Sequence, residues 1–320
     1  MTLLRDDWRQ PTTASVRHGF GHGLVKAAQA DQRVMALSAN LMSSVGLAEF
    51  AEVIGSPRYV EVGVAEQNLV TVAAGLAAMG AVPFAASYAA FSPGRNWEQI
   101  RTTICLNRQP VKLVGSHAGL NVGPDGATHQ MLEDIALMRV LPNMVVLAPG
   151  DAYEAEQLVQ AMVDDPRPNY LRMPRQKTPL FLQHQVTIGQ AYTLRPGTDV
   201  TLLGTGVMTY QLLQAAEQVA VHAGIDAEVI HVPTIKPLDT AAIIASATKC
   251  GVVITAEEGQ MAGGFGSAVA ELLAQQHQSV PVVRIGVDDQ FGESGTMAQL
   301  WHKHHLDSQS IAEVIQKVLQ

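Results

Sequence analysis

Short apolar runs alternate with longer stretches of helical periodicity along most of the chain. The apolar runs predict buried strands at residues 33–38, 82–87, 111–115, 144–147 and 170–173. Helical spacing of apolar residues occurs at residues 14–30, 66–79, 95–106, 131–140 and 152–163. Strands and helices that alternate with short connections predict a parallel sheet covered by helices on both faces.

The same alternation restarts after a break in the pattern. Gly189 and the pair Pro196-Gly197 interrupt residues 181–199, which we interpret as a linker that contributes an edge strand. The following strands are predicted at residues 200–203, 227–231, 251–255 and 282–285, with helices at residues 210–222, 241–247, 266–275 and 310–319. We therefore predict an α/β fold of two units with mainly parallel sheets flanked by helices, in domains 1–180 and 200–320.

Composition narrows the class of protein. Of 320 residues, 47% are hydrophobic and 16% are charged, which excludes a largely disordered chain. The net charge of −8 and the lack of Lys or Arg runs argue against a nucleic-acid partner. The two cysteines have no CxxC spacing, so they predict neither a disulfide framework nor a zinc site. The first residues lack the apolar core of a secretory signal, and we expect a cytoplasmic protein.

Residues 67–94 carry no charge, and part of this stretch is long enough to cross a bilayer. It is built from Ala, Gly, Ser and Thr, however, and it is broken at Gly80 and Pro83. A buried helix followed by a buried strand is the better interpretation, and no membrane association is expected. A helix that is apolar on all sides belongs in a deep core or at a subunit interface.

Polar residues that follow the predicted strands are candidates for chemistry, because ligands of such sheets bind beyond the carboxyl ends of the strands. Glu66 opens the uncharged helix, either as a partner of the helix dipole or as a buried carboxylate that shares a proton with a ligand nitrogen. The glycine-containing loop at 116–130 carries His117, Asp125 and His129, in a spacing that matches no zinc signature. This loop is either a flexible connection or part of a site.

Two further segments have competing interpretations. Tyr88 and Phe91 follow a predicted strand, with Arg95 close behind, and either pack in the core or offer a flat ligand a stacking surface. The glycine-rich residues 257–267 open a predicted helix, but they contain no GxGxxG motif. A closely packed helix start is therefore favoured there over a phosphate cradle.

Four motifs in order resemble the C-terminal half of transketolase, which comprises its pyrimidine-binding and C-terminal domains. They are RYVEVGVAEQN at 58–68, GPDGATHQ at 123–130, TAEEGQMAGGFGSAV at 255–269 and DDQFGESG at 288–295. Ala127 stands where many relatives have proline. The resemblance covers nearly the whole chain.

The resemblance implies a thiamine diphosphate enzyme that transfers a two-carbon ketol unit between sugar phosphates. Glu66 matches the family's catalytic glutamate, whose carboxylate hydrogen-bonds the pyrimidine ring, and Phe91 matches the residue that stacks on that ring. Tyr88 lies near this position, and Leu41 matches the residue that supports the bent cofactor. Asn40 stands where relatives often have aspartate.

The resemblance also assigns substrate-binding residues. Arg17, Ser44, His117 and Arg175 match positions that bind the sugar phosphate, with Arg172 as the rival of Arg175. Asp125 and His129 match positions that contact substrate hydroxyls, and His129 joins Glu66 as a candidate catalytic residue. Arg95 resembles, with an offset of one residue, a basic residue of the related deoxyxylulose-phosphate synthases.

The family holds the diphosphate and Mg²⁺ through a GDG…N motif in a separate N-terminal domain, and GDG does not occur in this sequence. We therefore expect no metal ligand here, a partner subunit that holds Mg²⁺, an α2β2 assembly and self-association of this chain. The alternatives are the β subunit of a 2-oxo-acid dehydrogenase E1 component and a non-catalytic regulatory paralogue. Both general pentose-phosphate metabolism and a dedicated route for one pentose stay open.

Overall fold

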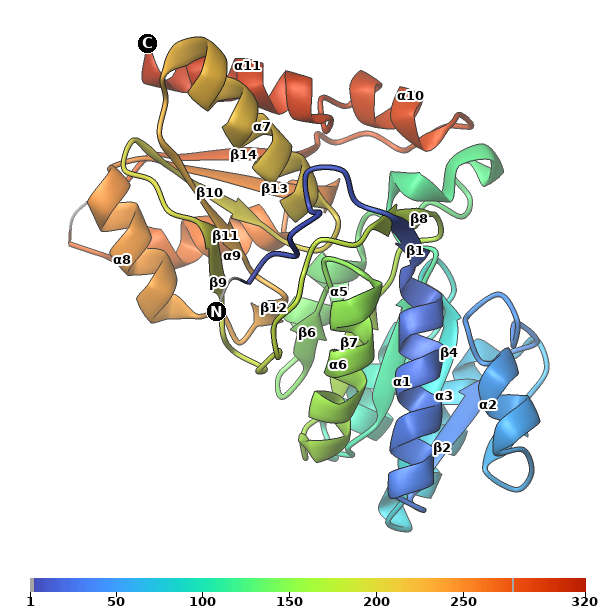
Figure 1. The fold of residues 1–320 in the computed structure, drawn as a ribbon. Helices are drawn as coiled ribbons and strands as arrows, with labels where there is room; N and C mark the ends of the chain where they lie inside the picture. The colour runs from blue at the N-terminus through green and yellow to red at the C-terminus, as the bar shows by residue number, and fades with distance from the viewer. Residues whose placement is uncertain (1–2, 278) are drawn as a thin grey trace.

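Two sheets organise the chain (Figure 1), in a computed structural model that describes residues 3–277 and 279–320. The first sheet has seven strands in the order β12-β6-β7-β5-β4-β2-β3, all parallel except β12, which is antiparallel to β6. The strands are β2 (Val34–Ser38), β3 (Tyr59–Glu61), β4 (Val82–Tyr88), β5 (Lys112–Ser116), β6 (Val145–Leu147), β7 (Asn169–Arg172) and β12 (Thr234–Lys236). β4 and β5 are buried along nearly their whole length, as expected for strands covered on both faces.

Helices cover both faces of the first sheet. One face carries α1 (Val16–Ala30), α2 (Ala48–Val53) and α6 (Ala152–Asp164). The other carries α3 (Glu66–Ala78), α4 (Trp97–Gln99) with the π-helix Ile100–Cys105 that continues it, and α5 (Asp134–Arg139). α1 and α6 pack closely where Gly19 of α1 meets the main chain of Ala152. A side chain at this position would collide with that main chain, so the close approach requires glycine.

The second sheet has five strands in the order β14-β13-β10-β11-β9. They are β9 (Tyr192–Arg195), β10 (Val200–Gly204), β11 (Ala227–His231), β13 (Val253–Gln260) and β14 (Val282–Val287). α7 (Met208–Ala223) and α11 (Ser308–Leu319) cover one face, and α8 (Thr240–Cys250) and α9 (Phe265–Leu273) cover the other. β9 is an antiparallel edge strand, as predicted for the linker.

The predicted fold class is confirmed, and several elements went unpredicted. β1 (Thr13–Ser15) pairs with β8 (Lys177–Pro179), and α2, β3 and α10 (Met297–Lys303) are further short elements. β12 belongs to the second half of the sequence but pairs with β6 in the first sheet. The bounds of the two domains stay a prediction. The uncharged stretch forms α3 and β4, as predicted. Within residues 3–277 and 279–320, no helix combines the length and apolarity that a membrane span requires.

Candidate active site

The candidate residues lie at one edge of the first sheet. β7, β5, β4, β2 and β3 are parallel neighbours, so the segments that follow their carboxyl ends lie side by side. These segments carry most of the predicted site: Asn40, Leu41 and Ser44 after β2, Glu66 after β3, Tyr88 at the end of β4 with Phe91 and Arg95 after it, His117, Asp125 and His129 after β5, and Arg175 after β7.

Glu66 is a buried carboxylate at the first residue of α3, with 5% of its surface exposed. Its two carboxylate oxygens lie 3.2 and 3.4 Å from Nη1 of Arg95. Asn96 fixes the helix start, because its Nδ2 donates to the carbonyl of Glu66 at 2.8 Å. The side chain of Arg95 is 53% exposed, so a ligand donor can replace it at the carboxylate and leave the guanidinium in water.

Aromatic and imidazole rings form a cluster beside this carboxylate. The ring of Tyr88 stacks on Phe91 at 5.8 Å and on His117 at 3.9 Å, measured between centroids. His129 meets the edge of Phe91 at 5.5 Å. The Arg95 guanidinium carbon lies 4.2 Å from the centroid of Phe91. Tyr88 and Phe91 are both half-buried, and Tyr88 also packs against the hydrophobic cluster; a stacking role for their rings stays a prediction.

His117 is buried in a left-handed backbone conformation, with φ of 57°. Its Nδ1 lies 3.0 Å from Oγ of Ser116. Burial, followed by the positive charges of Arg17 and Arg175 and by His129, lowers the pKa of His117 to about 3. The imidazole is therefore neutral near pH 7, and its surroundings favour an anion.

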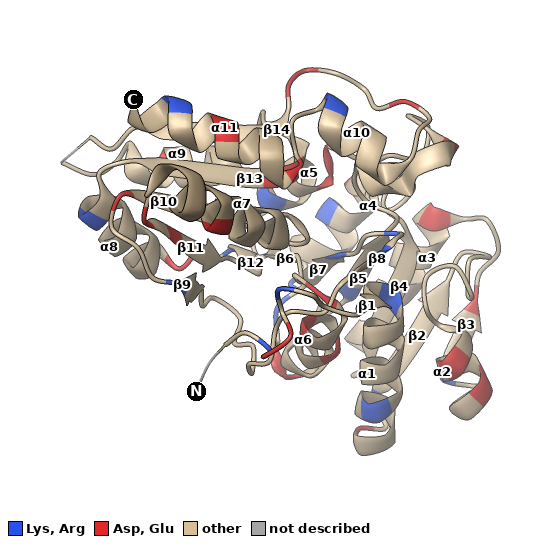
Figure 2. Cartoon of the chain, turned by 45° about the horizontal axis from the view of Figure 1, so that its top comes forward, with Lys and Arg blue, Asp and Glu red and all other residues tan. Residues whose placement is uncertain are grey.

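Arg17 and Arg175 lie together because β1 pairs with β8, which joins the start of α1 to the segment after β7. Arg17 donates to the carbonyls of Ser44 at 2.6 Å and of Arg175 at 3.0 Å. Burial lowers the pKa of Arg17, and the charge of Arg175 lowers it further. Among the described residues, Nε of Arg17 is buried without a hydrogen-bond partner. Figure 2 shows basic segments around β7 and β8 in the middle of the molecule.

Arg175 and Arg172 have different surroundings. Arg175 donates to the carbonyl of Val122 at 2.6 Å and lies 3.5 Å from the carboxylate of the exposed Asp125. Arg172 is 7% exposed, and its Nε lies 3.0 and 3.2 Å from the two oxygens of the buried Asp134. Its Nη2 donates to the carbonyl of Glu258 at 2.6 Å. The buried ion pair commits Arg172 to the core, and this geometry favours Arg175 at the site.

The three candidate residues on the loop after β2 differ in their burial and in their contacts. Asn40 is exposed with a left-handed φ of 59°, and its N–H donates to Oε1 of Glu61 at 2.6 Å. Leu41 is half-buried and packs against the same hydrophobic cluster as Tyr88. Ser44 contacts Arg17 through its main-chain carbonyl, not through its hydroxyl.

Several polar residues that organise this edge escaped sequence reasoning: Glu61, Asn96 and Asn121. Glu61 follows the unpredicted β3, and no spacing marks the other two as partners of Glu66 or Arg175. In the glycine-rich segment, the Glu257 carboxylate accepts from the N–H groups of Phe265 and Gly266, which confirms a packed helix start. In the part of the chain that the structure describes, no group of three or more His, Cys, Asp or Glu residues is arranged to hold a metal.

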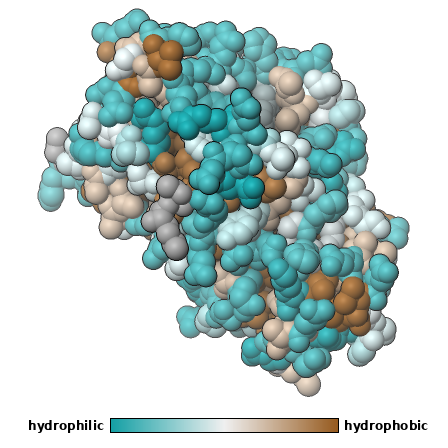
Figure 3. Space-filling model, viewed as in Figure 1, coloured by the Kyte–Doolittle hydropathy of each residue, from teal (hydrophilic) through white to brown (hydrophobic). Residues whose placement is uncertain are grey.

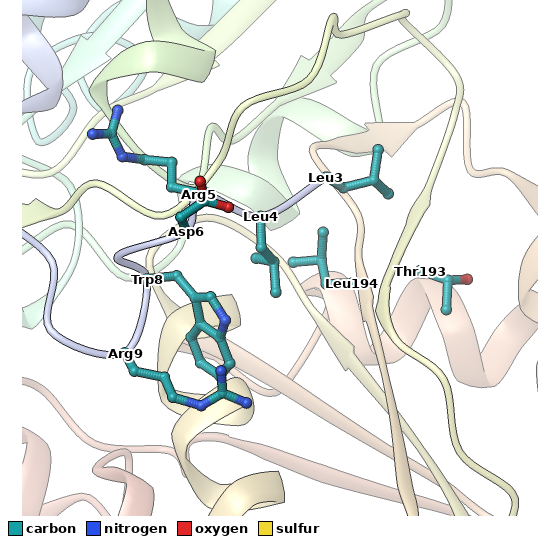
Figure 4. A pocket seen from close by; sticks show the side chains of 8 residues that line it. All are labelled: Leu3, Leu4, Arg5, Asp6, Trp8, Arg9, Thr193 and Leu194. Carbon is teal, nitrogen blue, oxygen red and sulfur yellow. The ribbon is translucent and has the colours of Figure 1, made fainter. Parts of the chain in front are cut away.

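A separate surface hollow of about 460 Å³ lies between the N-terminal segment and β9 (Figure 4). Its basic residues already have partners: Arg5 pairs with Asp7 at 3.0 Å, and Arg9 pairs with Glu217 at 2.9 Å. Arg9 also covers the ring of Trp8 at 4.5 Å. The candidate catalytic and binding side chains lie at the sheet edge, and not in this hollow.

Comparison with known proteins defines the class of the chain. Residues 12–180 match the family model described as transketolase, pyrimidine binding domain, and residues 189–311 match transketolase, C-terminal domain. Together with the two sheets, these matches place the chain among proteins with the α/β domains of thiamine diphosphate enzymes.

Relatives narrow this class. The chain is 38% identical to a putative transketolase C-terminal section of Methanocaldococcus jannaschii, over 95% of this chain and 96% of that protein. It is 39% identical to a 6-deoxy-6-sulfo-D-fructose transketolase subunit of a Clostridium species, over 99% and 96% of the two chains. A solved structure titled "Split gene transketolase, inactive beta4 tetramer" superposes with a TM-score of 0.88 at 39% identity, over 95% of this chain and 98% of that one. The chain belongs to the transketolase family, as its motifs indicated.

Proposed function

We propose that this chain is the C-terminal subunit of a split transketolase, which transfers a two-carbon ketol unit between sugar phosphates. The observation that carries the proposal is the buried carboxylate of Glu66 beside the rings of Tyr88 and Phe91, with Arg17 and Arg175 at the same sheet edge. Relatives that match this chain nearly end to end carry the names of a transketolase section and a transketolase subunit, which supports it.

The residues at this edge fit the pyrimidine end of thiamine diphosphate. Glu66 is a buried acceptor whose observed partner, Arg95, is exposed and replaceable. Phe91 and Tyr88 provide ring surfaces next to it, and Leu41 packs against the hydrophobic cluster that Tyr88 also contacts. When bound, the cofactor supplies a carbon nucleophile that carries the two-carbon unit. Glu66 would hold the proton of the pyrimidine nitrogen, which is a general acid–base role.

The diphosphate and Mg²⁺ require groups that we assign to a partner subunit. Arg95 lies over Phe91, where the pyrimidine ring would stack, and it must therefore move when the cofactor binds. Once displaced from Glu66, its guanidinium is available to the substrate, in keeping with the predicted role. Asn40 lies on the exposed loop after β2 and would line the cofactor site.

The anionic end of the sugar would bind to Arg17, His117 and Arg175. Two guanidinium groups supply charge, and the neutral His117 contributes a ring N–H or an acceptor without adding charge. Ser44 lies at the Arg17 end of this group, whereas Asp125 and His129 lie on the loop after β5 and would contact sugar hydroxyls. A phosphate is the proposed anion; a sulfonate likewise offers three acceptor oxygens but carries a smaller negative charge.

The proposed assembly is α2β2, with two copies of this chain in contact. α3 carries no charge after Glu66, and apolar residues are exposed at its two ends: Val64 is 70% exposed and Met79 is 87% exposed. The face drawn in Figure 3 is mostly hydrophilic, with separate hydrophobic patches. Exposed apolar residues at both ends of α3 are candidates for such a contact. The related tetramer consists, by its title, of β chains alone and is inactive.

Substitution of Glu66 tests the proposal. In a complex with the partner subunit, Glu66→Gln should lower kcat by roughly 10²–10⁴-fold, because the amide cannot hold the ring proton. Glu49→Gln is the matched control, because Glu49 is an exposed carboxylate in the first turn of α2. It should change kcat less than twofold, roughly, as surface substitutions do. A Glu66→Gln complex that turns over within a fewfold of wild type would contradict the assigned role.

A further inference from the structure

Two adjacent buried carboxylates on β13 serve different parts of the molecule. Glu257 and Glu258 are each 2% exposed, and successive side chains of a strand point to opposite faces. Glu257 stays within the second unit, where it accepts from the N–H groups of Phe265 at 2.7 Å and Gly266 at 2.8 Å at the start of α9. Glu258 reaches the first unit.

The Glu258 carboxylate accepts three hydrogen bonds. Its Oε1 accepts from the N–H of Asn121 and from Nε1 of Trp301, both at 2.7 Å. Its Oε2 accepts from Nδ2 of Asn121, also at 2.7 Å. All three partners are donors, so an ionised carboxylate satisfies each of them. Two of the three bonds come from Asn121, which lies in the loop after β5 that also carries His117 and His129.

Asn121 passes this contact on to the proposed anion site. Its Oδ1 accepts from the N–H of Arg175 at 2.6 Å and from the N–H of Gln176 at 3.4 Å. The Arg175 guanidinium donates to the carbonyl of Val122, the residue after Asn121, at 2.6 Å. Both the main chain and the guanidinium of Arg175 are therefore fixed by a turn that Glu258 holds.

The fit around the carboxylate is close on the loop side as well. Gly119 has a left-handed φ of 87°, and a Cβ added there would lie 2.5 Å from Oε2 of Glu258. The loop thus needs glycine at this point for its backbone conformation and for the approach of the carboxylate.

We propose that Glu258 is a positioning residue of the second unit, which acts through Asn121 to hold Arg175 in place for the anionic end of the substrate. The inference rests on the proposed function for the role of Arg175. Glu258 itself touches no substrate, and its effect on the reaction passes through one hydrogen-bonded neighbour. The second sheet thereby contributes to a site built on the first sheet.

Glu258→Gln breaks this arrangement with little change of shape. If the amide oxygen keeps the contacts to the Asn121 N–H and to Trp301, the amide nitrogen faces Nδ2 of Asn121, and two donors meet. Rotation of the Asn121 amide relieves that conflict but turns its nitrogen toward the N–H of Arg175. Either outcome loses one of the hydrogen bonds that link Glu258 to Arg175 through Asn121.

The experiment compares Glu258→Gln with Glu257→Gln, an equally buried carboxylate on the same strand. Hydrogen exchange on the full chain should show faster exchange in segments 117–130 and 173–177 for Glu258→Gln. Glu257→Gln should instead affect segment 261–268. In the assembled complex, Glu258→Gln should raise the KM of a phosphorylated acceptor roughly tenfold with kcat nearly kept. Its effect on an unphosphorylated short aldehyde should be much smaller.

The double variant Glu258→Gln/Asn121→Asp provides a partial rescue, because the new amide nitrogen can donate to the new carboxylate, which still accepts from the N–H of Arg175. The bond from Nδ2 of Asn121 to the carbonyl of Ala118 at 3.0 Å is lost in this variant. It should therefore slow the exchange again and bring KM part of the way back toward the wild-type value, even where Glu258→Gln alone folds poorly. Unchanged exchange in both segments, equal KM effects from the two glutamine variants, or equal effects on both acceptors would overturn the inference. A wild-type complex that transfers no ketol unit would refute the proposed function, while the exchange comparison still decides whether Glu258 orders Arg175.

Discussion

Replacement of Arg172 by methionine removes one half of a buried ion pair. Arg172 bridges Asp134, which is fully buried, and the carbonyl of Glu258. After the substitution, Asp134 keeps the hydroxyl of Tyr170, which donates to it at 2.8 Å. The carboxylate is otherwise left in the core without its cationic partner.

Loss of one partner from a buried ion pair costs about 3–5 kcal/mol of unfolding free energy. The surviving Tyr170 bond places Arg172→Met near the lower end, and the orphaned Glu258 carbonyl adds about 1 kcal/mol. At about 2–4 °C per kcal/mol for a large chain, the melting temperature should fall by roughly 10 °C. Methionine approximates the length of the arginine stem, so lost packing contributes little.

Thermal and urea unfolding of the full chain measure this effect. Arg175→Met is the matched control, because that side chain is part-exposed. Its pair with the exposed Asp125 is worth about 1 kcal/mol or less and its bond to the Val122 carbonyl about 1 kcal/mol, so the melting temperature of this variant should fall less than that of Arg172→Met. The double variant Arg172→Met/Asp134→Leu should recover part of the loss, since no charge is left unpaired, while the Tyr170 hydroxyl and the Glu258 carbonyl lose their partners. A melting temperature within 2 °C, roughly, of wild type for Arg172→Met would refute this reasoning. A stable variant with a selectively raised KM would instead return Arg172 to the phosphate site.

Three further outcomes follow from the structure. Because the pKa of His117 is about 3 in the folded state against 6.5 normally, its NMR signals should not titrate between about pH 5 and 8, and a midpoint near 6.5 would contradict this. The free energy of unfolding should also fall as the pH drops from 6.5 toward 3, because only the unfolded state binds the extra proton there. Gly119→Ala should lower the unfolding free energy by about 1–3 kcal/mol more than Gly224→Ala, which has a similar left-handed backbone but open space for a Cβ; equal losses in denaturant titrations would contradict the close contact with Glu258. Burial raises the pKa of Glu257 from 4.5 to about 7, so the folded state binds more protons between these values and stability should decline as pH rises through them; Glu257→Gln should flatten that decline, and an unchanged pH profile would contradict the assignment.

Much of the first sheet was predictable because its strands are buried on both faces and read as continuous apolar runs. β4 and β6 are examples, and the residues from Tyr88 to His129, at the carboxyl ends of β4 and β5, reach one edge as a consequence of parallel topology. Glu66 stood out because a carboxylate opens a helix that is otherwise uncharged. These signals are local in the sequence, so they can be recognised without knowledge of the tertiary contacts.

Contacts between distant segments left no such signal. β12 is three residues long, and nothing in its sequence indicates that it pairs with β6 of the other sheet. Glu258 and Asn121 are 137 residues apart, so their contact depends on how the two sheets pack. Arg172 and Arg175 lie in one short motif, and only their burial and partners separate a core ion pair from a residue of the proposed site.

The central claim is that this chain forms an active transketolase only with a partner that holds the diphosphate and Mg²⁺. Calorimetry with thiamine diphosphate and Mg²⁺, alongside a ketol-transfer assay, should be run on this chain alone and after mixing with a polypeptide that carries the family's GDG…N domain. The chain alone should bind the cofactor weakly and transfer no ketol unit, whereas the mixture should bind it tightly and catalyse transfer. Tight Mg²⁺-dependent binding and transfer by this chain alone would contradict it.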